Sequence, residues 1–112
     1  MELKKLQKSV DNWIKNYGVR YFDEMTNLAL LMEETGELAR LLARKYGEQS
    51  FKNPVSDDEV NNKIADEIGD IFFVLTCLAN QMNIDIEATM TENLKKKTSR
   101  DNTRHKNNPK LL

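Results

Sequence analysis

The spacing of apolar residues along the chain predicts four helices and no strands. In the first segment, about residues 2–17, apolar side chains recur every three or four positions, as they do on one face of a helix. The same spacing recurs over about residues 23–46, 57–82 and 86–97, and the middle two of these segments are apolar around most of their circumference. Strand-like alternation extends over no useful length, so the pattern predicts an all-α protein.

The residues between these segments are typical helix ends. Two glycines and one asparagine can adopt the backbone conformation that ends a helix. One serine and one aspartate can start a helix, because their side chains accept a hydrogen bond from its first turn. The helix-ending residues are Gly18, Gly47 and Asn83, and the helix-starting residues are Ser56 and Asp85. We therefore expect the helices to end and begin at these residues, with a loop over residues 47–55 between the second and third helices.

The length of 112 residues is that of one domain. We expect a single all-α domain over residues 1–106, resembling a four-helix bundle, followed by a disordered tail over residues 107–112. A domain of this size buries only about 60–70% of its unfolded surface, so assembly into a homo-oligomer would add stability.

The overall charge excludes some classes of function. The 17 basic and 18 acidic residues leave a net charge of −1, which argues against a protein that binds nucleic acid or a membrane by bulk attraction. We find no signal peptide, and the longest apolar runs are far short of the about 20 residues that span a bilayer. The single cysteine, Cys77, suits a buried position and a reducing cytoplasm, where we expect the protein to be located.

Two pairs of acids interrupt the apolar pattern of the second and third helices. Glu34 and Glu37 are three residues apart, as are Glu67 and Asp70, and side chains at this spacing share one face of a helix. On a helical wheel Glu34 and Glu67 fall inside the apolar arcs, whereas Glu37 and Asp70 fall at their edges. Glu33 lies on the polar face, so it needs no special partner.

Converging carboxylates repel one another and need a positive partner. All-oxygen ligation suits Mg²⁺ or Mn²⁺ better than zinc, and Mg²⁺ often completes its shell with the phosphates of a substrate. The segment from Lys95 to Lys106 carries six positive residues against one negative residue and could hold remaining phosphate charge. A di-iron site is a poor alternative because it needs Glu-x-x-His pairs and the one histidine, His105, lies in the tail.

The acid motifs resemble those of a known family. Glu33-Glu34-x-x-Glu37 followed by Glu67-x-x-Asp70, in an all-helical chain of this length, resembles the MazG-like nucleotide pyrophosphohydrolase family of the all-α NTP pyrophosphatase superfamily. The likeness extends from about Leu28 to Arg100. The family's mark is EExxE and a later ExxD, and the two halves together are specific.

This resemblance implies an all-α fold that forms homodimers or homotetramers and hydrolyses nucleoside triphosphates to the monophosphate and pyrophosphate with Mg²⁺. It implies that the acids matching Glu34, Glu37, Glu67 and Asp70 hold the metal. Lys96 and Arg100 would match phosphate-binding positions. Two departures from the family are a long link between the acid pairs and a lysine, Lys97, where asparagine is frequent.

Some roles stay open at the level of sequence. Either Glu33 or Glu34 could orient or deprotonate the attacking water, and Trp13 and Tyr17 could contact the base, although aromatics at helical spacing more often belong to a core. Two alternative functions also remain. One is a phosphoribosyl-ATP pyrophosphatase, and the other is a non-catalytic helical interaction module whose acids form surface salt bridges, as Glu37 could do with the arginine three residues on.

Overall fold

The computed structural model of the chain describes residues 2–112, which contain helices and no strand. The prediction of an all-α fold is therefore confirmed for this part of the chain, and none of its helices is long and apolar enough to cross a membrane. The elements, in order, are α1 (Leu3–Trp13), the π-helical turn η1 (Ile14–Gly18), α2 (Glu24–Tyr46), α3 (Asp57–Gln81), α4 (Ile86–Asp101) and the short 3-10 helix η2 (Pro109–Leu111).

The starts of α2, α3 and α4 are fixed by side-chain caps. Asp23, Ser56 and Asp85 each accept a hydrogen bond from the backbone N–H three residues later, at 2.7, 3.2 and 3.1 Å. Such a cap stabilises a helix by about 1 kcal/mol because it satisfies a donor that the helix leaves free. Asn83 has a φ of 55° just after α3, so the predicted helix-ending and helix-starting residues of this connection are confirmed.

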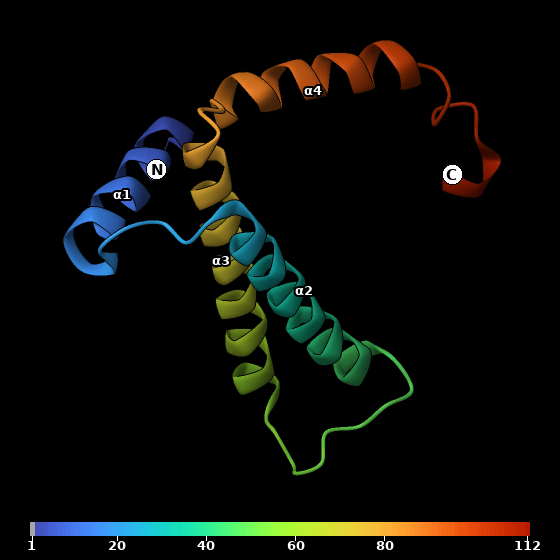
Figure 1. The fold of residues 1–112 in the computed structure, drawn as a ribbon. Helices are drawn as coiled ribbons and strands as arrows, with labels where there is room; N and C mark the ends of the chain where they lie inside the picture. The colour runs from blue at the N-terminus through green and yellow to red at the C-terminus, as the bar shows by residue number, and fades with distance from the viewer. Residues whose placement is uncertain (1) are drawn as a thin grey trace.

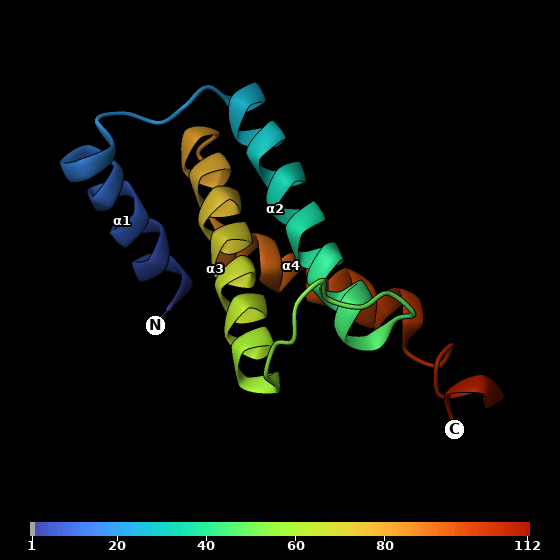
Figure 2. The same ribbon diagram turned by 90° about the horizontal axis from the view of Figure 1, so that it is seen from below.

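One cluster of buried residues lies between α1, η1 and α3, and Leu41 of α2 and Val60 of α3 are also buried. Helices α2 and α3 run antiparallel side by side, and α1 packs against α3 (Figures 1 and 2). Val10 and Ile14 of α1 and η1 are buried against Cys77 of α3, which confirms the buried position expected for that cysteine. Polar contacts join the same two helices, since Asn80 donates to the Gln7 carbonyl at 2.9 Å and accepts from the Gln7 amide at 3.0 Å.

Helix α4 projects away from the other three helices. Its first turn is held to α1, where the Ile86 N–H donates to the Gln7 side chain at 2.9 Å, but α4 has no buried residue (Figure 1). The radius of gyration is 17.9 Å, compared with about 13 Å for a compact chain of this length. Within one chain the four helices therefore do not close into the bundle that we expected. Helix α4 is also longer than predicted, since it ends at Asp101 rather than Lys97.

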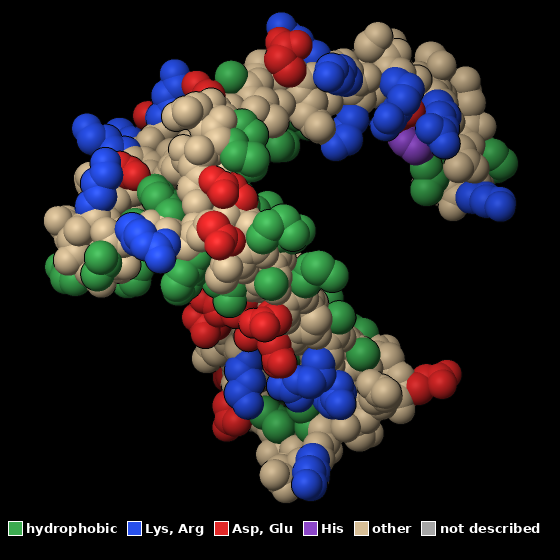
Figure 3. Space-filling view, viewed as in Figure 1, with side chains coloured by type: hydrophobic (Ala, Val, Ile, Leu, Met, Phe, Trp, Pro, Cys, Tyr) green, Lys and Arg blue, Asp and Glu red, His purple; other side chains and the backbone are tan. Residues whose placement is uncertain are grey.

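The projection of α4 leaves many apolar side chains uncovered. Figure 3 shows hydrophobic side chains along α2 on the side that faces the hollow beneath α4. The exposed apolar residues of α2, α3 and α4 include Leu28, Met32, Phe72, Leu75, Met90 and Leu94. An apolar surface of this extent is unusual for a chain that remains alone in water.

The connection from η1 to α2 contains a strained residue. Val19 has φ 70° and ψ −61°, and the Arg20 N–H donates to the Gly18 carbonyl at 2.8 Å, so the three residues form a γ-turn of the rare positive-φ kind. A β-branched residue is disfavoured there because its side chain crowds the backbone. The first helix ends at Gly18 as expected, but the positive φ falls on Val19, whose side chain is exposed and gains no packing in return.

We expect the substitution Val19→Gly to raise the free energy of unfolding by about 1 kcal/mol. Relief of a backbone strain of about 1–3 kcal/mol exceeds the extra entropy, about 0.5–1 kcal/mol, that glycine loses on folding. Urea denaturation at a fixed protein concentration measures the change. Val19→Ala is the matched control, because it keeps a Cβ in the strained conformation. A Val19→Gly protein no more stable than Val19→Ala would show that the turn is not strained.

Candidate metal centre

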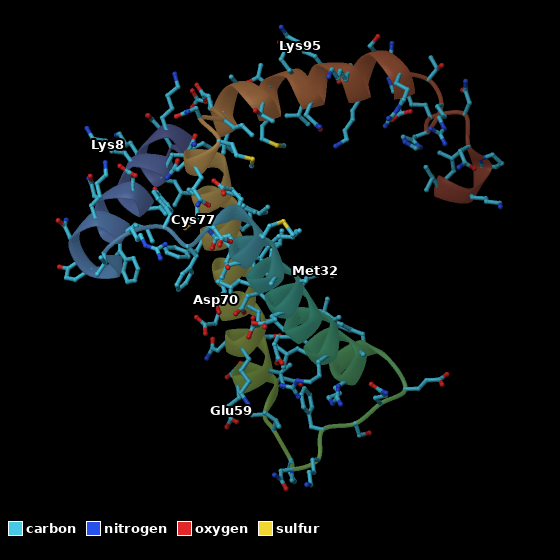
Figure 4. The ribbon with its side chains drawn as sticks, viewed as in Figure 1. Lys8, Met32, Glu59, Asp70, Cys77 and Lys95 are labelled. Atoms are coloured by element: carbon cyan, nitrogen blue, oxygen red, sulfur yellow. The ribbon has the colours of Figure 1, made fainter. Side chains whose placement is uncertain are left out.

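Three acids from α2 and α3 meet midway along the helix pair. One carboxylate oxygen each from Glu34, Glu67 and Asp70 lies within 4.8 Å of the other two. Glu67 and Asp70 are three residues apart on α3 and so share the face that packs against α2, where Glu34 lies. Figure 4 labels Asp70 at this level of α3, and Figure 3 shows acidic side chains gathered there. We call these three residues the acid cluster.

The acid cluster is electrostatically unfavourable on its own. Two charges 4.8 Å apart repel by about 3 kcal/mol at an effective dielectric constant of about 20, and by less where water screens the exposed Asp70. The facing Glu67 carboxylate, with which Glu34 can share a proton, and then burial raise the pKa of Glu34. Loss of solvation, followed by the charge of Glu34, raises the pKa of Asp70. Both shifts show that the cluster favours added positive charge.

The geometry of the acid cluster fits a divalent cation. Glu67 Oε2 is sealed from solvent and has no hydrogen-bond partner within residues 2–112. Leaving a charged acceptor unpaired in this way is costly, and in the described part of the chain no lysine or arginine forms an ion pair with any member of the cluster. Three carboxylates with no nitrogen or sulfur ligand suit a hard cation such as Mg²⁺ or Mn²⁺.

The other two acids of the first motif lie outside the cluster. Glu37 is exposed, and its carboxylate accepts a hydrogen bond from Arg40 Nε at 3.3 Å, which is the second of the two options that the sequence left open. Glu33 is exposed on the polar face, as the helical wheel predicted. The structure therefore brings together three of the four predicted metal ligands and leaves Glu37 one turn away from them.

The predicted phosphate-binding residues lie on α4, apart from the acid cluster. Lys96 is exposed on a shallow groove of that helix, and Arg100 pairs with Asp101 at 2.8 Å, a contact that lowers the pKa of Asp101 to about 2. Because α4 projects away from α2 and α3, one chain does not bring these cations to its own acids (Figure 1).

The two aromatic residues predicted to contact a base differ in position. Trp13 lines a groove that also includes Asp70 and Phe73, and its ring meets Phe73 edge to face with 5.5 Å between centroids. Tyr17 lies 6.0 Å from Trp13 between ring centroids and is 76% exposed. Trp13 therefore borders the acid cluster, whereas Tyr17 faces solvent.

One buried polar residue in this region was missed from the sequence. Asn27 is 4% exposed, and its amide nitrogen donates to Gln81 Oε1 at 2.7 Å and to the Phe22 carbonyl at 3.4 Å. Asn27 precedes Glu34 by seven residues and so lies on the same face of α2. A polar residue inside an apolar arc is the signal that identified Glu34, and it could have identified Asn27.

The chain is similar to known proteins over most of its length. The family model described as MazG nucleotide pyrophosphohydrolase domain matches residues 22–105. The chain is 38% identical over 102 residues to the uncharacterized protein YpjD of Bacillus subtilis (strain 168), a match that covers 91% of this chain and 88% of YpjD.

Two solved structures are similar to this one. A crystal structure of YpjD from Bacillus subtilis has a TM-score of 0.75 at 36% identity and covers 90% of this chain and 97% of its own. A Bacillus-conserved MazG protein, described as a nucleotide pyrophosphohydrolase, has a TM-score of 0.70 at 35% identity and covers 86% of this chain and 88% of its own. The site-bearing helices α2 and α3 lie within the segment that the family model matches.

We expect Mg²⁺ to stabilise the protein through the acid cluster. At about 100 times its dissociation constant, a metal that binds only the folded state adds about 2.7 kcal/mol to the free energy of unfolding. The substitution Glu67→Gln should abolish this gain and, without metal, raise the stability by about 1 kcal/mol because it removes a repulsion. Thermal and urea unfolding with and without Mg²⁺ measure both effects.

The exposed loop acid Glu48 provides the matched control for this prediction. Glu48→Gln removes the same charge outside the cluster, so it should leave the response to Mg²⁺ unchanged. A Glu67→Gln protein that Mg²⁺ still stabilises as much as the unsubstituted protein would contradict the assignment of Glu67 as a ligand.

Proposed function

The chain belongs to the MazG nucleotide pyrophosphohydrolase domain family, and on this basis we propose that it hydrolyses ribo- or deoxyribonucleoside triphosphates to the monophosphate and pyrophosphate. The observation that carries the proposal is the acid cluster with its sealed, unpartnered Glu67 Oε2. Three carboxylates without a cationic partner are suited to a divalent cation, and such a cation is suited to a polyphosphate. The proposed cofactor is Mg²⁺, with Mn²⁺ as a substitute.

We propose that some of the acids bind the metal and that one of them accepts a proton from water. When bound, Mg²⁺ supplies Lewis-acid polarisation of the phosphate oxygens. Glu34, Glu67 and Asp70 would hold it, joined by Glu37 once that side chain leaves Arg40. Glu33 precedes Glu34 by one residue, is exposed on the polar face and forms no ion pair within residues 2–112, and we assign to it the orientation and deprotonation of the attacking water.

The reaction is a hydrolysis at the α-phosphorus. The oxygen of water forms a bond to the α-phosphorus, the bond from that phosphorus to the bridging oxygen breaks, and pyrophosphate leaves with its electron pair. The proton of the water passes to Glu33. Most of the catalysis would come from positioning and charge neutralisation rather than from a covalent step on the protein.

A homo-oligomer, dimer or tetramer, would explain the shape of the chain. Exposed apolar side chains lie on α2, α3 and the projecting α4, and a second copy could cover them. Since α4 does not reach the acids of its own chain, Lys96 and Arg100 would act on the phosphates held by the acids of the second copy. Each active site would then combine acids from one protomer with cations from its partner.

We expect the purified protein to release pyrophosphate from nucleoside triphosphates in the presence of Mg²⁺, and Glu67→Gln to lower kcat/KM by at least about 100-fold. Loss of a metal ligand removes both substrate binding and charge neutralisation. A coupled assay that detects pyrophosphate separately from orthophosphate measures the reaction, with Glu48→Gln as the control.

The same assay, run with different substrates, separates the alternative functions. Turnover of phosphoribosyl-ATP in preference to ordinary nucleotides would replace the proposed substrate class. Release of orthophosphate alone would exclude pyrophosphohydrolysis. A lack of any turnover, together with no effect of Mg²⁺ on stability, would favour the non-catalytic interaction module.

Mixing two inactive variants tests the shared site. If α4 acts on the partner's acids, refolding Glu67→Gln together with Arg100→Ala should restore about a quarter of the original activity. Half of the dimers would be mixed, and a two-fold dimer of this kind holds one intact site of two. Size-exclusion chromatography confirms assembly, and the two variants refolded separately are the controls. No recovery in properly assembled mixed dimers would place Arg100 outside the partner's site.

A further inference from the structure

A cavity of about 260 Å³ lies next to the acid cluster. It is enclosed by η1, by the segment that joins η1 to α2, and by the facing sides of α2 and α3. Trp13 and Phe73 line both this cavity and the groove that contains Asp70, so the same aromatic pair borders the two spaces. In Figure 4, Cys77, which also lines the cavity, lies farther along α3 than Asp70, at the level where the connecting segment crosses.

The cavity is offset from the acid cluster by one helical turn. On α2, the lining residue Leu30 precedes Glu34 by four residues, and on α3, Val74 follows Asp70 by four residues. Because α2 and α3 run antiparallel, both offsets point toward the same end of the helix pair (Figure 1). One turn rises about 5.4 Å, which is on the scale of the sugar that separates a nucleobase from its first phosphate.

The walls of the cavity suit a flat aromatic ligand. Trp13 and Phe73 are set edge to face at an interplanar angle of 89°, and Leu30 and Val74 supply further apolar lining. Aromatic side chains bind nucleobases by stacking on their π-faces, whatever the base. The stacking surface alone would therefore accept any base, and discrimination has to come from a polar group.

The hydrogen-bond network fixes the orientation of one such group, Asn27. The Phe22 carbonyl can only accept, and it accepts from the side-chain nitrogens of both Asn27 and Gln81. Gln81 must then present its oxygen to the Asn27 nitrogen, as observed at 2.7 Å. The amide of Asn27 cannot be reversed without setting oxygen against oxygen, so its nitrogen faces the network and its Oδ1 points elsewhere.

Asn27 Oδ1 is an unused acceptor. Within residues 2–112 it accepts no hydrogen bond, yet it is not sealed from solvent, since the one sealed and unpartnered side-chain atom there is Glu67 Oε2. Asn27 lines the cavity. Since its nitrogen faces the network and its Oδ1 has no partner, we infer that Oδ1 is the atom that a small molecule in the cavity would contact.

Another polar group on the cavity wall is already occupied. The hydroxyl of Tyr21 donates to Asp11 at 2.6 Å and accepts from the Asn80 side chain at 3.1 Å. The exposed Arg20, which also lines the cavity, can only donate. Among the polar side chains of the lining, Asn27 is therefore the buried one, and its Oδ1 is a free acceptor.

We propose that this cavity is the nucleobase pocket and that Asn27 determines its specificity, because Oδ1 accepts a hydrogen bond from an exocyclic amino group. Cytosine and adenine carry that group, whereas uracil and hypoxanthine carry a carbonyl oxygen at the same position, which would meet Asn27 Oδ1 as a second acceptor. The inference rests on the proposed function for its substrate, and it adds to that function a choice of base.

Matched substrates test the proposal directly. CTP and UTP differ at position 4 of the ring, and ATP and ITP differ at position 6, in each case by an amino group against a carbonyl. We expect kcat/KM for pyrophosphate release to be at least about tenfold higher for the amino member of each pair, since the other sets a carbonyl oxygen against Asn27 Oδ1 and leaves both acceptors unpaired. Equal kcat/KM within both pairs would overturn the proposal.

Two variants separate the oxygen of Asn27 from its structural role. Asn27→Leu keeps the volume but removes the acceptor, so the preference within each pair should fall to less than about threefold. Gln81→Met removes the same contact between α2 and α3. The Phe22 carbonyl still accepts from the Asn27 nitrogen and so keeps Oδ1 pointing away from it, and the preference should remain. A preference that survives Asn27→Leu, or that is lost equally in Gln81→Met, would contradict a direct contact. The comparison of substrates in the unsubstituted protein stands even if Asn27→Leu fails to fold.

Fluorescence gives a readout that does not depend on hydrolysis. Trp13 is the one tryptophan of the chain and lines the cavity, so a bound base should change its emission. We expect CMP and AMP to bind at least about tenfold more tightly than UMP and IMP in titrations without metal. Preferential binding without any turnover would support the pocket and reject the proposed function. Pyrophosphate release without preference in either assay would support the function and reject the role of Asn27.

Discussion

The repulsion among three carboxylates held between α2 and α3 is the constraint on which the rest of the structure depends. The capped start of each helix and the apolar contacts along their faces bring the two helices together, and this packing forces Glu34 against Glu67 and Asp70. The free energy of helix packing therefore offsets a charge repulsion that the folded chain alone does not relieve. Such an arrangement is unfavourable for stability and useful for binding, since a cation recovers the energy when it enters.

Helices α1 and α4 differ in the number and kind of contacts that hold them to the rest of the chain. Helix α1 is joined to α3 by buried apolar contacts and by hydrogen bonds of the Gln7 and Asn80 side chains. Helix α4 is held mainly through its first turn and has no buried residue. The part of the site that holds the proposed metal is thus completed within one chain, and the part proposed to hold the phosphates is not.

The sequence correctly predicted those features of the fold that depend on residues close together in the chain. The caps at Ser56 and Asp85 depend on bonds to residues three positions away, and the inward placement of Glu34 and Glu67 follows from helical periodicity. The direction of α4, in contrast, depends on contacts with α1, far away in the chain, for which periodicity carries no information. The network of Asn27 likewise joins residues 54 positions apart, so the sequence could show that Asn27 is buried but not which of its atoms stays free.

Helix α4 has no buried residue, so little packing within one chain stabilises it. An isolated helix of about 16 residues is marginal in water, because the cost of nucleating it is offset mainly by packing. We therefore expect the order of α4 to depend on association, so that an unassembled chain would have a formed metal centre but no formed phosphate site. Under the assembly and the activity proposed above, dilute chains would lack the phosphate site, and the rate of hydrolysis would rise more steeply than the concentration of the protein.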